Sequence, residues 1–218
     1  MVIFMNNNLK SIRKDWELIT SLVDNNKKIL DIGCGEGELI KKLQENKNAD
    51  TRGLEVNGDF VRNALALGLS VVEGNAENDL RQYSDQSFDY VILSQTLQAM
   101  YNPKNVLLEM LRIGSKVIVS FPNFGHWRIR VQLLTTGKMP VTKGLPYTWY
   151  ETPNIHFFTL KDFVEMCNQA KIFIDTLTSA RLVVPDFNGS VFTYDDEKPL
   201  ILDGETIVQK LEGAVTSS

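Results

Sequence analysis

The sequence predicts an α/β fold in which a mostly parallel, open sheet carries helices on both faces. Short apolar runs alternate with amphipathic segments over residues 27–121, as strands and helices do in such folds. The apolar run FDYVILS at 88–94 is typical of a strand that is buried on both faces. The stretch DIGCGEGE at 31–38 places three glycines between a strand and a helix, which indicates a tight turn. Ligands of such sheets bind at the carboxyl ends of the strands.

The individual elements follow from apolar spacing and from capping residues. Apolar side chains at intervals of three and four predict a leading helix within 8–25. Asn57 can cap one later helix, and Asn102 followed by Pro103 can begin another. The predicted strands are 27–33, 51–56, 70–74, 88–94 and 116–121, and the predicted helices between them are 36–47, 57–69 and 102–114.

The chain changes character after the fifth strand. Residues 122–158 are rich in aromatic residues, Gly and Pro, and we expect an insertion that folds over the edge of the sheet. Thr159 and Asp162 predict a capping box for a helix at 159–170, and 171–180 has the pattern of a sixth strand. Beyond it, SVFTY and PLILD are weaker strand signals. We expect a single domain over 1–218, in which 27–121 forms the core and 159–218 adds the last helix and strands.

The composition excludes several classes of function. The 218 residues are 43% hydrophobic and carry a net charge of -4, so no overall positive field would attract nucleic acid. Apolar runs are too short for a signal peptide or a membrane span, which favours a cytoplasmic protein without a membrane partner. Cys34 and Cys167 fit no metal-ligand spacing, and we interpret both as small buried hydrophobic residues.

The spacing of the glycines distinguishes between two nucleotide-binding motifs. A dinucleotide fingerprint would require glycine at position 38, where this chain has Glu38. Residues Asp31, Gly33, Gly35 and Gly37 instead resemble the first motif of class I S-adenosylmethionine-dependent methyltransferases, which have a Rossmann-like fold. Asp31 can supply a carboxylate for the ammonium group of S-adenosylmethionine or S-adenosylhomocysteine. Glu55, at the end of the second strand, can accept hydrogen bonds from both ribose hydroxyls.

The resemblance implies further contacts with this cofactor. Gly74, Asn75 and Ala76 stand where methyltransferases of this class often have Gly-Asp-Ala beside the adenine, and the carboxamide of Asn75 can still accept a hydrogen bond. Ser94 and Gln95, after the fourth strand, are then expected at the methionine end. The alternative is that the glycines form only a tight turn and that Glu55 is a solvated strand end.

Three longer segments carry a narrower resemblance. LSQTLQAMYNP, SFPNFGHWRIRVQLLTTGKMPVT and LPYTWYETPNIHF closely resemble the MetW family of methionine-biosynthesis proteins, and the similarity extends over about residues 27–175. This resemblance implies a methyltransferase-like fold and a link to homoserine acylation, with homoserine O-acyltransferase as a partner. It does not identify a methyl acceptor.

Two classes of function therefore stay open. The chain can be a small-molecule methyltransferase of methionine metabolism, or a non-catalytic accessory that regulates the acyltransferase. His126 and His156, the only two histidines, are candidates for a catalytic base, although each can instead pack among the surrounding aromatic residues. The cations of the same segment suit a solvated rim, an acidic partner surface or a carboxylate substrate; they are Arg128, Arg130, Lys138 and Lys143.

Overall fold

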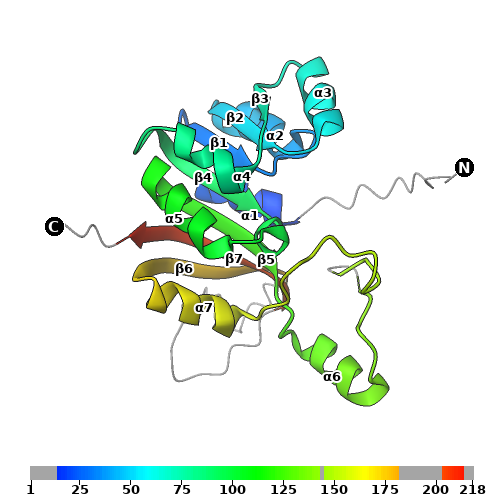
Figure 1. Cartoon of the computed structure of the whole chain (residues 1–218). Helices are drawn as coiled ribbons and strands as arrows, with labels where there is room; N and C mark the ends of the chain where they lie inside the picture. The colour runs from blue at the N-terminus through cyan, green and yellow to red at the C-terminus, as the bar shows by residue number, and fades with distance from the viewer. Residues whose placement is uncertain (1–13, 143–144, 182–202, 214–218) are drawn as a thin grey trace, which may run out of the picture.

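The computed structural model describes residues 14–142, 145–181 and 203–213, which contain a seven-stranded sheet in the order β3-β2-β1-β4-β5-β7-β6 (Figure 1). The strands are β1 (Lys28–Ile32), β2 (Asp50–Glu55), β3 (Val71–Glu73), β4 (Phe88–Ser94), β5 (Gly114–Pro122), β6 (Ile172–Arg181) and β7 (Asp203–Gly213). The helices are α1 (Lys14–Leu22), α2 (Glu38–Lys47), α3 (Gly58–Ala66), α4 (Ala76–Asp79), α5 (Pro103–Ile113), α6 (Trp127–Thr136) and α7 (Leu160–Gln169). Two short 3₁₀ turns complete the set, η1 (Leu80–Gln82) and η2 (Leu97–Ala99).

Strands β1 to β5 are parallel, as the alternation of strands and helices predicts. The α/β fold class is thus confirmed, as is the sixth strand at β6. Strand β7 lies between β5 and β6 and runs antiparallel to both. It was not predicted: SVFTY lies outside the described residues, and PLILD reaches them only at Asp203.

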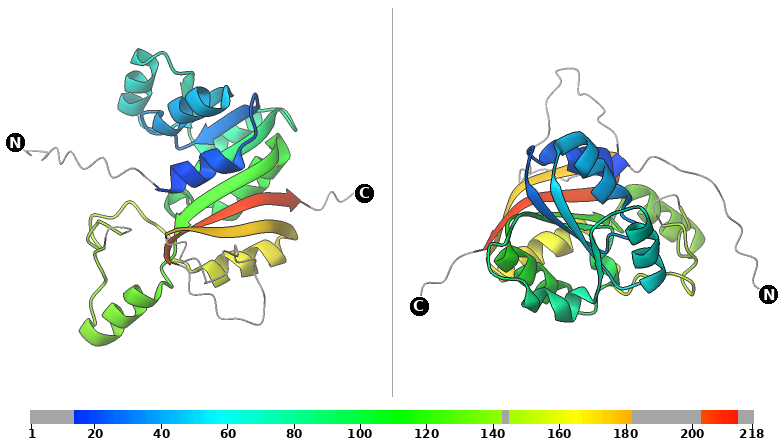
Figure 2. Two further views of the ribbon diagram at one scale, coloured as in Figure 1. Left: turned by 180° about the vertical axis from the view of Figure 1, so that it is seen from behind. Right: turned by 90° about the horizontal axis from the view of Figure 1, so that it is seen from above.

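Helices cover both faces of the sheet because successive strand residues point to opposite sides. Ile29 of β1 and Ile118 of β5 pack with residues of α1 and α2 on one face. Leu30 of β1 and Val119 of β5 pack with residues of α5 and α7 on the other. Helix α1 therefore lies in front of the sheet when the molecule is seen from behind (Figure 2), whereas α5 and α7 face the viewer in Figure 1.

Three of the predicted helix starts are confirmed in their position. The side chain of Asn57 accepts hydrogen bonds from two backbone amides at the start of α3. Thr159 and Asp162 form the predicted capping box of α7. Asn102 and Pro103 begin α5, but the Asn102 side chain makes no capping hydrogen bond there. The fixed φ of proline at the first helical position suits this start without one.

Segment 122–158 leaves the sheet after β5 and contains α6, which extends away from the sheet in Figures 1 and 2. The far end of the segment returns to the body of the fold. There the backbone amides of Ile155 and His156 both donate to the carbonyl oxygen of Gln98 in η2, at 2.9 Å each. Because η2 follows β4, this segment is attached directly to a carboxyl-end loop of the sheet.

Candidate functional site

The glycine-rich turn after β1 has a backbone that other residues adopt only with strain. Gly33, Gly35 and Gly37 have φ values of 68°, 57° and 82°. A β-carbon on Gly33 would lie 2.7 Å from Oγ1 of Thr96, and one on Gly37 would overlap the side chain of Leu69. In the part of the chain that the structure describes, no atom beyond Gly35 and its two neighbours lies within 4 Å of the position that a β-carbon on Gly35 would take. The turn is therefore packed on its flanks and open at its centre.

Glu55 ends β2 beside this opening, and its carboxylate is held by two backbone amides. Oε2 accepts a hydrogen bond from the amide of Gly35 and Oε1 accepts one from the amide of Asn57, both at 2.9 Å. The side chain is buried, and these two bonds fix its orientation without using every lone pair of its oxygens. Each oxygen can thus still accept a hydroxyl donor from a ligand.

Asp31 lies in β1, where its backbone pairs with Gly53 of β2, two residues before Glu55. It is buried, as the sequence predicts for a residue inside a parallel sheet. Adjacent parallel strands bring Asp31 and Glu55 to the same edge of the sheet. Both carboxylates expected for the cofactor thus stand on neighbouring strands.

Asn75 and Ala76 lie at the start of α4, directly after β3. Oδ1 of Asn75 accepts a hydrogen bond from the amide of Glu77 at 2.9 Å, and the Asn75 amide donates to Oδ2 of Asp79 at 2.7 Å. The carboxamide oxygen that we expected at the adenine is thus used as a helix cap, with its second lone pair left for a ligand. A cleft of about 450 Å³ that is lined by residues of α4 and α5 includes both Asn75 and Ala76.

Ser94, at the end of β4, belongs to a buried hydrogen-bond network with the first turn of α1. Its hydroxyl donates to Oδ2 of Asp15 at 3.0 Å and lies 3.3 Å from the hydroxyl of Ser120 in β5. Asp15 is fully buried, and sequence reasoning missed it because only the tertiary fold brings α1 over these strand ends. Gln95, next to Ser94, has a positive φ of 55°, which marks a strained turn at the same edge.

The acceptor groups at this edge suit an adenosyl amino acid. The centre of the glycine turn is open, Glu55 is oriented toward the turn, and Asp15 and Asp31 add two more buried carboxylates. Buried carboxylates favour a ligand that carries positive charge. An ammonium or sulfonium group meets that requirement.

The two candidate histidines stand at opposite ends of segment 122–158. His126 is buried and caps α6, where its Nδ1 accepts a hydrogen bond from the amide of Arg128 at 3.4 Å. His156 is half-buried, and its Nε2 lies 3.4 Å from the carbonyl oxygen of Tyr101. Both rings thus contact backbone groups, and a role as catalytic base stays a prediction.

Neither cysteine has the properties of a nucleophile. Burial raises the pKa of the Cys34 thiol to about 12, with further increases from Asp31 and Glu55, and burial alone raises the pKa of Cys167 to about 12. Both thiols therefore stay protonated at neutral pH, and the interpretation of both as buried hydrophobic residues is confirmed. Within 14–142, 145–181 and 203–213, no group of three His, Cys, Asp or Glu residues could hold a metal ion.

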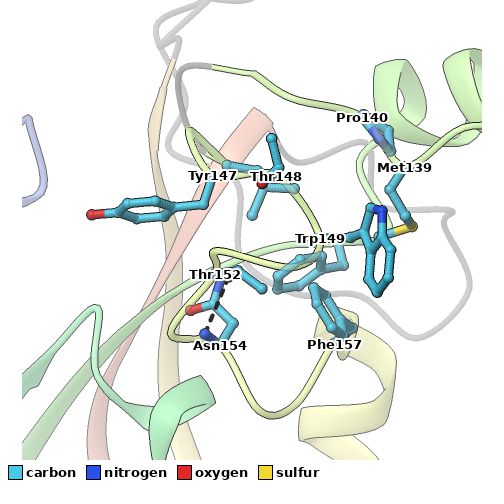
Figure 3. Close-up of a pocket in the computed structure, with 10 residues that line it drawn as sticks. Met139, Pro140, Tyr147, Thr148, Trp149, Thr152, Asn154 and Phe157 are labelled. Atoms are coloured by element: carbon cyan, nitrogen blue, oxygen red, sulfur yellow. Dashed lines mark hydrogen bonds between the residues drawn. The ribbon is translucent and has the colours of Figure 1, made fainter. Parts of the chain in front are cut away.

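A second hollow, separate from the cleft between α4 and α5, lies within segment 122–158 (Figure 3). Its lining includes Met139, Tyr147, Trp149 and Phe157, and the backbone amide of Asn154 donates to Oγ1 of Thr152 beside them. The volume of about 20 Å³ has room for roughly one water molecule. This hollow is too small for a cofactor.

The helices in the described parts of the chain include none that is long and apolar enough to cross a membrane.

Comparisons with known proteins agree with this architecture. A possible histamine N-methyltransferase from Thermotoga maritima, described as S-adenosylmethionine-dependent, superimposes with a TM-score of 0.61 at 16% identity, over 92% of this chain and 88% of its own. A TehB-like S-adenosylmethionine-dependent methyltransferase from Corynebacterium glutamicum gives a TM-score of 0.58 at 16% identity, over 93% of this chain and 88% of its own. The fold is therefore the Rossmann-like fold of class I methyltransferases.

A more specific match comes from the sequence. The bifunctional methionine biosynthesis protein MetXA/MetW of Rhodopirellula baltica is 32% identical over 174 residues, which are 76% of this chain and 28% of the relative. This chain thus corresponds to less than a third of that protein. The model of the family described as methionine biosynthesis protein MetW matches residues 13–188. The resemblance drawn from the three sequence segments is thereby confirmed, and the chain belongs to the MetW family of methionine biosynthesis proteins.

Proposed function

We propose that this chain binds S-adenosylmethionine at the carboxyl ends of β1, β2, β3 and β4 and transfers its methyl group to a small molecule of methionine metabolism. The observation that carries the proposal is the Glu55 carboxylate, held by the amides of Gly35 and Asn57 beside an open glycine turn. S-adenosylmethionine-dependent methyltransferases of the same fold support the choice of cofactor.

Each residue at this edge would contact a different part of the cofactor. Glu55 would accept hydrogen bonds from the ribose hydroxyls, and Asp31 would face the ammonium group. Asn75 and Ala76 would hold the adenine, while Ser94 would lie at the methionine end. The glycine turn, Gly33 to Gly37, would let the ligand approach the backbone closely.

The bound sulfonium supplies an electrophilic methyl group together with a good leaving group. Acceleration can then come from positioning alone, so the chain needs no pair of proton-transfer residues. His126 or His156 would serve as a base only for an acceptor that must lose a proton.

The ribose assignment predicts that Glu55→Ala weakens binding of S-adenosylhomocysteine about ten-fold or more, because charge-assisted hydrogen bonds are lost from a buried site. Glu45→Ala is the matched control, since Glu45 lies exposed on α2, away from the turn. Calorimetric titration of protein freed of carried-over ligand measures both affinities.

Unchanged affinity of Glu55→Ala would remove the ribose assignment. Failure of the folded wild-type protein to bind S-adenosylhomocysteine would contradict the proposed cofactor. Methyl transfer is tested separately, by following S-adenosylhomocysteine formation with small carboxylic acids from methionine metabolism as acceptors.

A second candidate function is that of an accessory that binds S-adenosylmethionine and adjusts a homoserine O-acyltransferase. The MetXA/MetW relative favours it, because a MetW part there shares one chain with a MetXA part. Linked parts meet at a high effective concentration, which favours an association. If ligand binding and partner binding are coupled, each changes the affinity of the other by the same factor.

The two functions give different results when this chain is mixed with the purified acyltransferase of the same organism. The accessory role predicts a change in acyl-transfer rate that depends on S-adenosylmethionine and leaves no S-adenosylhomocysteine. The methyltransferase role predicts stoichiometric S-adenosylhomocysteine once an acceptor is present, with or without the acyltransferase.

A further inference from the structure

Helix α6 has a stripe of apolar side chains that the described parts of the chain leave exposed. None of its ten residues is buried. Trp127, Val131 and Leu134 are spaced by four and three residues, which places them on one face, and they are 47%, 48% and 86% exposed. Apolar stripes on helices normally face a protein core. This stripe instead lies on the part of the molecule that extends away from the sheet (Figures 1 and 2).

Further exposed apolar residues follow α6 along the chain, in the rest of segment 122–158. Met139 and Val141, which follow the helix, are 43% and 53% exposed, and Trp149 and Tyr150 are 72% and 68% exposed. The rings of Trp149 and Tyr150 contact each other edge to face, with centroids 5.6 Å apart. Aromatic residues, Met and Arg are the residue types enriched in protein interfaces. We call the exposed residues of these described parts, 127–141 and 149–150, the α6 surface.

The charge of the α6 surface is opposite to that of the whole chain. Residues 122–150 contain no Asp or Glu, although the full chain has a net charge of -4. Arg128, Arg130 and Lys138 are exposed there, and the guanidinium of Arg128 lies 5.3 Å from the ring centre of Trp127. An apolar stripe bordered by cations alone is complementary to an apolar surface with an acidic rim.

We propose that the α6 surface is the docking site for an acidic face of the homoserine O-acyltransferase. The choice of this partner rests on the accessory role proposed above. A second copy of this chain is a poorer occupant, because a symmetric dimer through this face would bring the same cations together. A lipid surface is poorer too, since the apolar residues are divided between a ten-residue helix and an irregular segment instead of one long amphipathic helix.

Hydrogen bonds connect the segment that contains the α6 surface to the carboxyl ends of the strands, where we propose that the cofactor binds. The same segment that contains α6 is attached to Gln98 through the amides of Ile155 and His156. The side chain of Gln98 donates to the carbonyl oxygen of Gln95 at 2.7 Å, and Gln95 follows Ser94. A partner seated on α6 therefore contacts a segment whose other end is bonded to the loop beyond β4.

The test is the dissociation constant of the complex with the purified acyltransferase, measured by surface plasmon resonance. Two double variants of the α6 surface are each expected to raise this dissociation constant about ten-fold or more. One combines Val131→Asp with Leu134→Asp, and the other combines Arg130→Glu with Lys138→Glu. Two matched controls alter exposed residues elsewhere and should leave the dissociation constant within two-fold. One is Leu65→Asp in α3 with Leu67→Asp at its C-terminal cap, and the other is Lys41→Glu with Arg62→Glu. Added salt should weaken the wild-type complex.

Each outcome decides the proposal. Loss of affinity in the α6 variants alone supports it, with circular dichroism and urea unfolding showing that the variants fold. Equal affinity of α6 variants and wild type would overturn the docking site while leaving the accessory role. A wild-type protein that forms no complex would overturn both. A dimer that the α6 variants dissociate, or binding to anionic vesicles in place of the acyltransferase, would also overturn it. Cofactor binding is measured independently, so its failure would be seen separately.

Discussion

Gly35 is the residue whose backbone and surroundings bear most directly on the proposed binding of S-adenosylmethionine. Its φ is positive and its β-carbon position is open, so alanine there would fit into space that the protein itself does not fill. We predict that Gly35→Ala lowers the free energy of unfolding by only about 1–2 kcal/mol, the cost of a left-handed backbone. It should weaken S-adenosylhomocysteine about ten-fold or more, because the methyl group would occupy ligand space.

Gly68→Ala is the control for this prediction, since Gly68 also has a positive φ and an open β-carbon position but lies beyond α3. Urea unfolding should show a similar loss of stability for both variants, and calorimetry should show a loss of affinity only for Gly35→Ala. Equal affinities would mean that the open side of the turn does not face the ligand.

The sequence identifies the residues that belong to a contiguous motif and misses those that the fold brings in. Gly33, Gly35 and Glu55 follow from spacing along consecutive elements, so their proximity is predictable. Asp15 and Ser120 are far apart in sequence, and no local pattern indicates that both contact Ser94. The capping role of Asn75 was also missed, although an Asn before a short helix is the signal that could have revealed it.

At the scale of elements, α1 is joined to the sheet by a buried carboxylate as well as by apolar packing. Asp15 accepts hydrogen bonds from Ser94 in β4 and from Ser120 in β5. Removing a buried acceptor leaves its donors without that partner, which costs about 1–3 kcal/mol. We predict that Asp15→Ala lowers the free energy of unfolding by this amount, measured by urea denaturation.

Glu17→Ala is the matched control for α1. Glu17 lies in the same first turn and shares the favourable interaction with the helix dipole, but it is exposed. Its loss should change the free energy of unfolding by less than about 0.5 kcal/mol. Equal effects of the two substitutions would show that the dipole, and not the contact with β4 and β5, accounts for the stability.

Two elements escaped prediction because their local patterns point elsewhere. In α6, apolar residues alternate at 127, 129, 131 and 133, a period of two that favours a strand. In β7, the sequence DGETIVQKLEG has few apolar residues, and its pairing with β5 and β6 joins parts far apart in the chain. Strands β1, β4 and β5 were predictable because burial on both faces requires long apolar runs.

At the scale of the whole molecule, β7 joins the parallel part of the sheet to β6. Its backbone pairs with Ile118 to Pro122 of β5 on one side and with β6 on the other. We predict that a chain ending after residue 202 exposes an unpaired edge of β5 and aggregates, whereas one ending after residue 213 keeps the strand and stays monodisperse. Size-exclusion chromatography and circular dichroism compare the two, and a monodisperse, native-like shorter chain would contradict the prediction.

The order of the strands also constrains how the protein folds while it is being synthesised. Strands β1 to β6 all leave the ribosome before β7, although β7 lies between β5 and β6 in the sheet. Until it emerges, β5 and β6 cannot reach their final arrangement, because the backbone groups of both strands that pair with β7 lack that partner. The early strands can begin to fold as a unit during translation. The described sheet is completed only when β7 has emerged, and until then the edge of β5 is open to non-native pairing.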